Sequence, residues 1–136
     1  MRVTLDTNAL VRIVVADEPA QTTAAQKIIT DATLIVLTVP CLCELVWVLR
    51  RVYNFDREAI ATALKTLANT DNIIIDRPTV EAGIQFLDSG GDFADGAIAF
   101  EGRSLGGEIF VSFDKRAVML VEQQGGYARL LKTARS

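Results

Sequence analysis

Acidic residues recur in this chain at positions from which several carboxylates could hold a metal ion together. Asp92 and Asp95 are three residues apart at the predicted start of a helix, directly after the turn at residues 90–91. Residues i and i+3 share one face of a helix, so these two carboxylates are expected to point the same way. Simple capping is the alternative, because carboxylates in the first turn also suit the helix dipole.

Two further aspartates directly follow runs of β-prone residues. Asp6 follows the run at residues 3–5, and Asp114 closes a second such run. The carboxyl ends of the strands form the edge where ligands bind in open parallel α/β sheets. The alternative for Asp6 is a turn former before a helix that Thr7 or Asn8 caps.

Glu44 interrupts a stretch, residues 41–49, that is otherwise apolar nearly all round the predicted helix. Helices that are hydrophobic on every side are buried, and a buried, unpaired carboxylate costs several kcal/mol. We therefore expect Glu44 to meet a cation, to be protonated, or to face a polar pocket. A salt bridge to Arg50 or Arg51 is the alternative, but six or seven residues along a helix span roughly 10 Å.

Strands and helices alternate along the chain in a way that would position these acids. This alternation predicts one α/β domain over residues 1–136, with a mainly parallel central sheet and helices on both faces. Its last few residues are expected to be a mobile tail. Pro40, Asp56 and Pro78 mark predicted helix starts. Strands are expected near residues 3–5, 33–38, 72–76 and 108–114, with 127–131 as a last edge strand or a partner-binding segment.

Composition excludes several classes of protein. The chain has 136 residues, half of them hydrophobic, and no apolar run near the roughly 20 residues that a membrane span needs. The N-terminus lacks the features of a signal peptide. With no histidine and only Cys41 and Cys43, a zinc site is not expected, and the two thiols are predicted to be reduced core residues of a cytoplasmic protein. A net charge of −3 argues against binding nucleic acid by general basicity.

Right-handed crossovers would bring the acids to one edge of the predicted sheet. Carboxylates that lie close together repel one another unless a hard cation neutralises them. Mg²⁺ and Mn²⁺ prefer oxygen ligands, and this chain offers no histidine. The acids therefore indicate Mg²⁺- or Mn²⁺-assisted phosphoryl chemistry.

Four segments together resemble a known family. Leu5-Asp6-Thr7-Asn8, Cys43-Glu44-Leu45, Asp92 to Ala99 and Val111-Ser112-Phe113-Asp114 are similar, in order and spacing, to the motifs of PIN domains. More closely, they resemble the VapC-type toxin ribonucleases of prokaryotic toxin–antitoxin pairs. The resemblance covers essentially the whole chain, and it implies a metal-dependent endoribonuclease.

The resemblance also implies roles for single residues. Asp6, Glu44, Asp95 and Asp114 would form an acidic quartet that binds Mg²⁺ or Mn²⁺ and activates water. Asp6 and Asp95 would hold the metal mainly, while Glu44 and Asp114 complete its shell and position the attacking water. Asp92 matches a frequent additional acid.

Small polar residues and bases complete what the resemblance implies. Asn8 and Ser112 would orient the first and last acids. Gly96 departs from the alanine that is frequent in the family. Glycine lowers the stability of the helix but leaves the Asp95 carboxylate in place, so the departure affects the expected rigidity of the helix and not the expected reaction. Arg12, Lys115 and Arg116 are predicted phosphate contacts, with plain surface as the alternative.

The expected partners are RNA as the substrate, a second copy of the chain in a homodimer, and a cognate antitoxin. Such an antitoxin would occlude the acidic groove with a basic side chain. Two other functions stay open. A non-catalytic PIN-like or receiver-like binding module is one, and the complete set of acids argues against it. A haloacid-dehalogenase-type phosphatase is the other, and it needs a second aspartate where this chain has Asn8.

Overall fold

A computed structural model of the protein describes residues 1–133 and divides the chain into two compact units. The first unit is Met1–Arg77 and the second begins at Pro78. Each contains parallel strands and the helices that connect them, which confirms the α/β class. The mobile tail predicted at the C-terminus includes residues 134–136, which lie outside the described residues.

The first unit has a parallel sheet with the strand order β1-β2-β3. β2 lies in the middle, where Ile35 is opposite Val3 of β1 and Ile73 of β3. The central strand β2 is continuously apolar, as strands covered on both sides are, whereas β1 carries the exposed residues Arg2 and Thr4. The strands are β1 (Arg2–Thr4), β2 (Leu34–Val36) and β3 (Ile73–Ile74).

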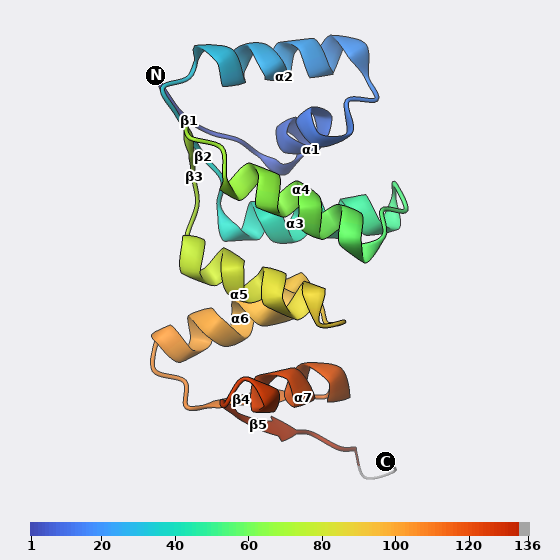
Figure 1. The fold of residues 1–136 in the computed structure, drawn as a ribbon, viewed down its shortest axis with the longest axis vertical. Helices are drawn as coiled ribbons and strands as arrows, with labels where there is room; N and C mark the ends of the chain where they lie inside the picture. The colour runs from blue at the N-terminus through green and yellow to red at the C-terminus, as the bar shows by residue number, and fades with distance from the viewer. Residues whose placement is uncertain (134–136) are drawn as a thin grey trace. The chain divides into compact units, whose positions relative to one another are not determined.

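Helices make the crossovers between these strands (Figure 1). They begin where the capping residues predict: Thr38 accepts a hydrogen bond from the Cys41 amide, and Asp56 accepts one from the Ala59 amide at 2.7 Å. Pro40 lies in the first turn that follows Thr38, as expected. The helices are α1 (Thr7–Val15), α2 (Pro19–Asp31), α3 (Val39–Arg51) and α4 (Arg57–Ala68).

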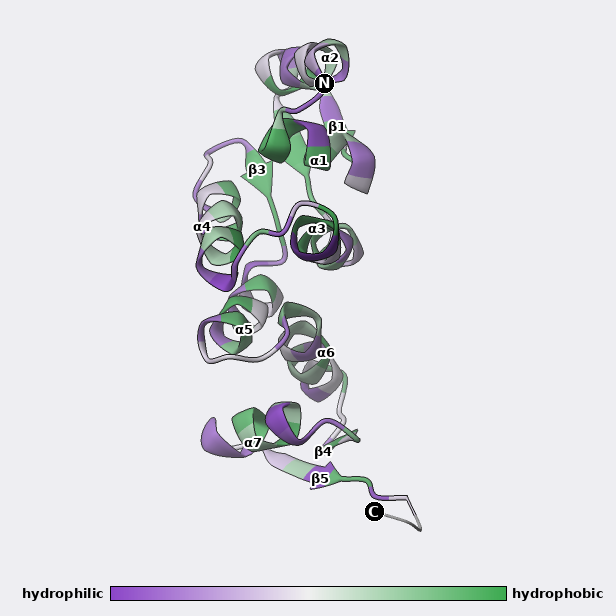
Figure 2. Ribbon diagram, turned by 90° about the vertical axis from the view of Figure 1, so that its right-hand side faces the viewer, coloured by the Kyte–Doolittle hydropathy of each residue, from purple (hydrophilic) through white to green (hydrophobic). Residues whose placement is uncertain are grey.

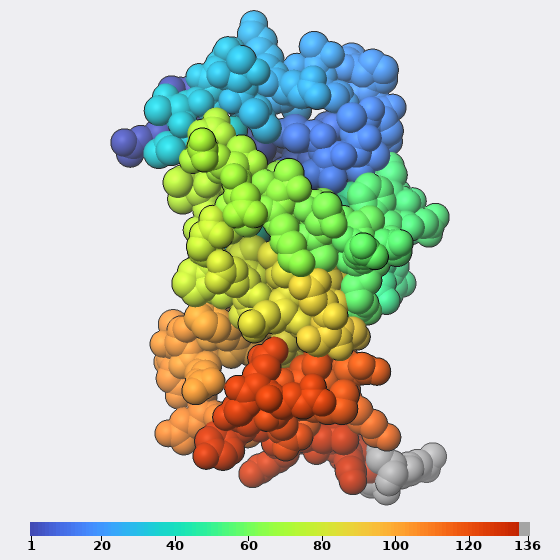
Figure 3. Space-filling model, in the orientation of Figure 1, coloured from blue at the N-terminus to red at the C-terminus, as the bar shows by residue number. Residues whose placement is uncertain are grey.

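The core of the first unit lies between the sheet and these helices. In Figure 2 the strand β3 is strongly hydrophobic, while β1 is partly hydrophilic, and helices make up most of the visible surface of this unit in Figure 3. In α2 the side chains of Thr22 and Ala25 are buried, while Ala24 is exposed. The side chains that are almost completely buried are Leu10, Ile35, Leu37, Leu42, Leu45, Leu49, Ile60 and Leu64.

A polar network joins α1 to the end of α3. The Arg12 guanidinium donates to the Asp17 carboxylate at 2.7 Å and to the Tyr53 hydroxyl at 3.1 Å. The Tyr53 hydroxyl in turn donates to the other Asp17 oxygen at 2.9 Å. Arg12 therefore has a structural role, and its predicted contact with phosphate would compete with these bonds.

The second unit has two parallel strands that α7 connects. Ser112 of β4 is opposite Leu130 of β5, so residues 127–131 do provide a strand. The helix after Asp114 begins directly at Lys115, because Asp114 caps it. The elements are α5 (Arg77–Asp88), α6 (Phe93–Ser104), β4 (Ile109–Ser112), α7 (Lys115–Gln123) and β5 (Tyr127–Leu130).

Gly96 is the residue through which α6 packs closely on α5. A Cβ at this position would lie 2.6 Å from the Ala82 carbonyl oxygen and 2.8 Å from the Phe86 ring. The backbone oxygen cannot move aside, so the glycine permits a close helix contact rather than loosening the helix. This explains in physical terms why glycine, and not alanine, follows Asp95 here.

We expect Gly96→Ala to destabilise the protein by about 1–3 kcal/mol, as other overpacking substitutions do. Gly102→Ala is the matched control, because it lies in the same helix and a Cβ there would meet nothing within 4 Å. Alanine should stabilise that position by up to about 1 kcal/mol through its helix propensity. Urea denaturation of both variants checks this, and equal stabilisation by both would contradict the close packing at Gly96.

Candidate functional site

Asp6 is placed at the end of β1 by its role as the cap of α1. Its backbone is extended, and its Oδ1 accepts a hydrogen bond from the Ala9 amide at 2.9 Å. The cap is therefore Asp6 itself and not Thr7 or Asn8, which are the first residues of the helix. Asp6 is exposed, and Oδ2 lies outside this bond, so the carboxylate can take a further ligand.

Glu44 lies on the exposed face of α3, which corrects the expectation that this helix is buried all round. The opposite face is buried, but Glu44 is exposed and Trp47, one turn further on, is 59% exposed. The apolar composition of the helix predicted burial on every side, but the large apolar side chain of Trp47 lies on the solvent side. Burial therefore gives no reason to expect that Glu44 binds a metal ion or is protonated. The residues that α3 buries are Cys41, Leu42, Leu45, Val46 and Leu49.

The two candidate site acids of the first unit, Asp6 and Glu44, both lie near one thiol. Burial raises the pKa of Cys41, a hydrogen bond with Thr7 lowers it, and the charges of Glu44 and Asp6 raise it again. Because both carboxylates act electrostatically on the same sulfur atom, Asp6 and Glu44 both lie close to Cys41. The first unit thus brings together one strand-end acid and one helix acid. Within the described residues neither cysteine is part of a disulfide; Cys41 is buried, as predicted for a core residue, whereas Cys43 is only half-buried.

The second unit brings three acids together around the start of α6. Asp95 lies in the first turn of this helix and is half-buried. Burial raises the pKa of Asp95, and the charges of Asp92 and Asp114 raise it further. A carboxylate whose charge is opposed both by burial and by two like charges is the arrangement that a bound cation relieves.

Asp92 stands at the N-cap position of α6, but its side chain makes no capping hydrogen bond. Capping, the simple alternative for this residue, is therefore wrong for the side chain. Its charge instead acts on Asp95, one turn along the helix. Asp92 is exposed, so its carboxylate is open to solvent and to a ligand.

Asp114 is fixed more firmly than the other acids. Its Oδ1 accepts hydrogen bonds from the Arg116 amide at 2.8 Å and the Ala117 amide at 3.2 Å, which caps α7. Its own amide donates to Ser112 Oγ at 2.9 Å. Ser112 thus holds the backbone of Asp114 at the end of β4, in line with the predicted orienting role.

The two bases after Asp114 are the first residues of α7, and both are exposed. The Arg116 guanidinium lies against Gly90, the first residue of the turn before α6. One cation of the second unit is thus held beside the loop that leads to Asp92. Lys115 and Arg116 remain predicted phosphate contacts.

The donor set fits a hard divalent cation, because every acid offers oxygen, and the raised pKa of the Cys41 thiol near Asp6 and Glu44 favours its protonated form over a metal-binding thiolate. Among the residues that the structure describes, no group of three or more Asp, Glu, Cys or His side chains is placed to hold a metal ion. The quartet of Asp6, Glu44, Asp95 and Asp114 therefore stays a prediction. Within residues 1–133, no helix is long and apolar enough to cross a membrane.

The alternating order of strands and helices, with acids after β1 and β4 and at the start of α6, defines an α/β protein. A sequence profile of the PIN domain family matches residues 3–120, which is most of the chain and extends over both units. The chain belongs to the PIN domain family. No curated protein and no solved structure matches it significantly. PIN domains are in general nucleases that use divalent metals such as Mg²⁺ or Mn²⁺.

Proposed function

We propose that this protein is an endoribonuclease that hydrolyses RNA phosphodiester bonds with Mg²⁺ or Mn²⁺. The observation that supports it best is the raised pKa of Asp95, caused by burial and by the charges of Asp92 and Asp114. Folding places these like charges together at a cost to stability, which is typical of a site that a ligand completes. Family membership supplies the reaction class.

Each acid has a role in this proposal. Asp6 and Asp95 would hold the cation mainly, while Glu44 and Asp114 would complete its shell and position the attacking water. A bound divalent cation orients the phosphate, lowers the pKa of the water and stabilises the leaving oxygen. Ser112 holds Asp114 in place through its backbone amide, and Asn8 is proposed to do the same for Asp6.

Cleavage of a labelled single-stranded RNA, with Mg²⁺ and with EDTA, tests the reaction class. We expect cleavage by the wild type only with the metal. Asp56→Asn should cleave as the wild type does. It is the matched control for variants of the site acids, because Asp56 also caps a helix but belongs to neither group of acids. RNA that stays bound in EDTA, with no metal site detected by titration, would instead favour the non-catalytic module.

Asp92→Ala should weaken cleavage, and Asp95→Ala should abolish it. Asp92 makes no capping bond, so its removal leaves α6 intact and takes away only a nearby charge. Loss of such an outer group typically costs about 10–100-fold. Single-turnover cleavage rates check this, and equal losses in the two variants would make Asp92 a full member of the site.

We further propose that the protein is the toxin of a type II toxin–antitoxin pair, cytoplasmic and homodimeric. The resemblance of the four acidic segments to VapC-type toxins supports this. The exposed carboxylates of Asp6, Glu44 and Asp114 would accept a basic side chain of the antitoxin. A short reading frame directly upstream that encodes a small DNA-binding protein, and whose product stops RNA cleavage in vitro, would support this role. An active nuclease without such a neighbour would be a general PIN nuclease.

A further inference from the structure

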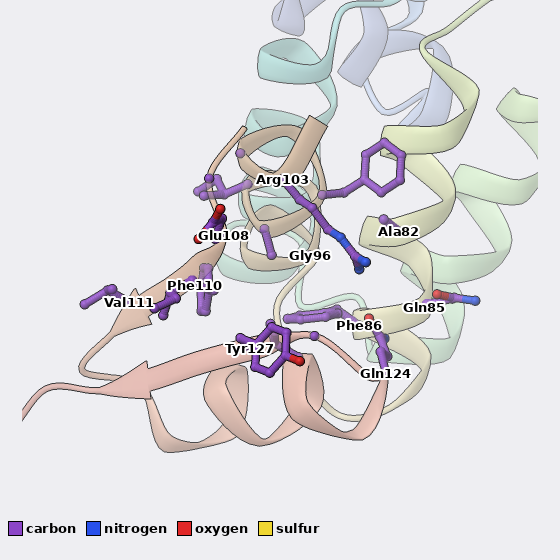
Figure 4. Close-up of a pocket in the computed structure, with 18 residues that line it drawn as sticks. Ala82, Gln85, Phe86, Gly96, Arg103, Glu108, Phe110, Val111, Gln124 and Tyr127 are labelled. Carbon is purple, nitrogen blue, oxygen red and sulfur yellow. The ribbon is translucent and has the colours of Figure 1, made fainter. Parts of the chain in front are cut away.

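The second unit contains a hollow of about 330 Å³ that the predicted acids do not occupy. It lies between the second half of α6, the strands β4 and β5, and parts of α5 and α7 (Figure 4). This volume is near the lower end for small-molecule sites, so it suits one compact group. Its floor includes the Phe86 ring, which is almost completely buried.

Aromatic side chains line this cavity from different elements. Phe86 comes from α5, Phe100 from α6, Phe110 from β4 and Tyr127 from β5. Tyr127 is 77% exposed, so its ring is available to a ligand that enters from solvent. Flat apolar rings around a small volume favour a flat ligand that can stack on them.

Polar groups that recognise nucleobases line the same cavity. Figure 4 shows the Arg103 side chain extending from α6 toward Phe86. A guanidinium plane stacks on bases, and carboxamides such as those of Gln85 and Gln124 can pair with base edges. An apolar side chain of a partner protein would leave these groups without partners when it covered them, which costs free energy.

We propose that this cavity binds one base of a single-stranded RNA, beside the acids of the second unit. This inference rests on the proposed ribonuclease function and extends it to how the substrate is held. α6 carries Asp95 and, directly after it, Gly96 of the cavity wall. β4 carries Val111 of the wall and leads to Asp114. A nucleotide whose base enters the cavity would thus be held by the same two elements that position the acids.

Binding without cleavage is the first test. The anisotropy of a fluorescein-labelled 12-nucleotide RNA of mixed sequence is measured with full-length protein in EDTA. Tyr127→Ala should weaken binding about tenfold, and Tyr127→Phe should restore it, because stacking needs the ring and not the hydroxyl. The dependence of affinity on salt should not change in Tyr127→Ala, because that dependence counts phosphate contacts.

Arginine variants separate stacking from charge. Arg103→Lys keeps the charge but loses the plane, so it should bind nearly as weakly as Arg103→Ala. Arg129→Ala is the matched control: it removes an exposed arginine from the same strand as Tyr127, outside the cavity wall. If Arg103→Lys binds like the wild type, or Arg129→Ala is as weak as Arg103→Ala, charge alone is responsible and the base pocket is wrong.

Photocrosslinking tests the same contact without any substitution. An RNA that contains 4-thiouridine is irradiated with the wild-type protein in EDTA, and the tryptic peptides are analysed by mass spectrometry. The adduct should appear on residues 117–129, which end shortly after Tyr127. Adducts only on peptides that contribute no residue to the cavity wall would overturn the proposal. So would unchanged RNA binding by Tyr127→Ala together with an altered oligomeric state, which would make the cavity a protein interface.

These outcomes are separable from those of the proposed function. If RNA is cleaved but the cavity variants bind RNA normally, the proposal that the cavity binds a base is wrong and the proposed ribonuclease function is retained. If no cleavage is found but the cavity variants lose RNA, the pocket stands in a protein that binds RNA without cutting it.

Discussion

Asp95→Asn should remove RNA cleavage and, at the same time, make the metal-free protein more stable. Asparagine keeps the size of the side chain but has no charge for the cation or for Asp92 and Asp114 to act on. We expect the cleavage rate to fall at least about 100-fold, as for loss of a group that holds a catalytic metal. The melting temperature should rise by a few degrees, because the variant no longer buries a carboxylate among like charges.

The pH dependence of this stabilisation has a definite sign. The pKa of Asp95 is higher in the folded protein than its ordinary value of 3.8. The folded state therefore holds this proton more tightly, and Asp95 begins to cost stability as the pH rises above the ordinary value, fully so above the folded pKa. The advantage of Asp95→Asn should be present at neutral pH and shrink as the pH falls toward about 4.

Thermal denaturation followed by circular dichroism, with and without Mg²⁺, measures both effects. Mg²⁺ should raise the melting temperature of the wild type, since it binds the folded state, and should leave Asp95→Asn nearly unchanged. Asp56→Asn serves as the control and should respond to Mg²⁺ as the wild type does. A variant that is less stable than the wild type, or equally stabilised by Mg²⁺, would contradict a metal site at Asp95.

The elements of the fold could be predicted because their signals are local. A cap needs only the residue itself and amides two or three positions on, so Asp56 marks the start of α4 from sequence alone. Proline at the first turn of α3 and acids that close β-prone runs are equally local. The same locality explains why Asp6 and Asp114 were found: each ends a strand and caps the next helix.

The features that could not be predicted depend on contacts between distant residues. Arg12 was predicted to contact phosphate, but it bonds to Asp17 and to Tyr53, and the tyrosine that completes this network lies 41 residues further on. Glu44 looked buried because the composition of its helix is apolar, and only the packing of α3 shows which face Trp47 takes. The glycine at position 96 is explained by the Ala82 carbonyl oxygen of α5, which lies where a Cβ of α6 would have to fit.

The cavity of the second unit was missed for the same reason. Phe86, Phe110 and Tyr127 are far apart in the sequence, and single aromatic residues most often belong to a core. Their spacing follows no periodicity, because each comes from a different element. Arg103 did not indicate a binding site in the sequence either, since one basic residue in the last turn of a helix is already explained by the helix dipole.

Asp6 has two roles that asparagine and alanine separate. Asparagine caps helices as well as aspartate does, so Asp6→Asn should preserve the bond from the Ala9 amide and the stability of α1. Alanine removes the cap and should cost about 1 kcal/mol in addition. Both variants should lose RNA cleavage at least about 100-fold if the carboxylate holds the metal. A loss of cleavage only in Asp6→Ala would make Asp6 a structural cap.

Combining Asp6→Asn with Asp95→Asn tests whether the acids of the two units serve one metal. Residues that act as a unit give strongly non-additive losses, because the first substitution already removes what the second would. The double variant should then cleave RNA about as slowly as the slower single variant in single-turnover assays. Independent roles would instead multiply the two losses. The proposed quartet predicts that the two losses do not multiply, and multiplied losses would assign the chemistry to one unit alone.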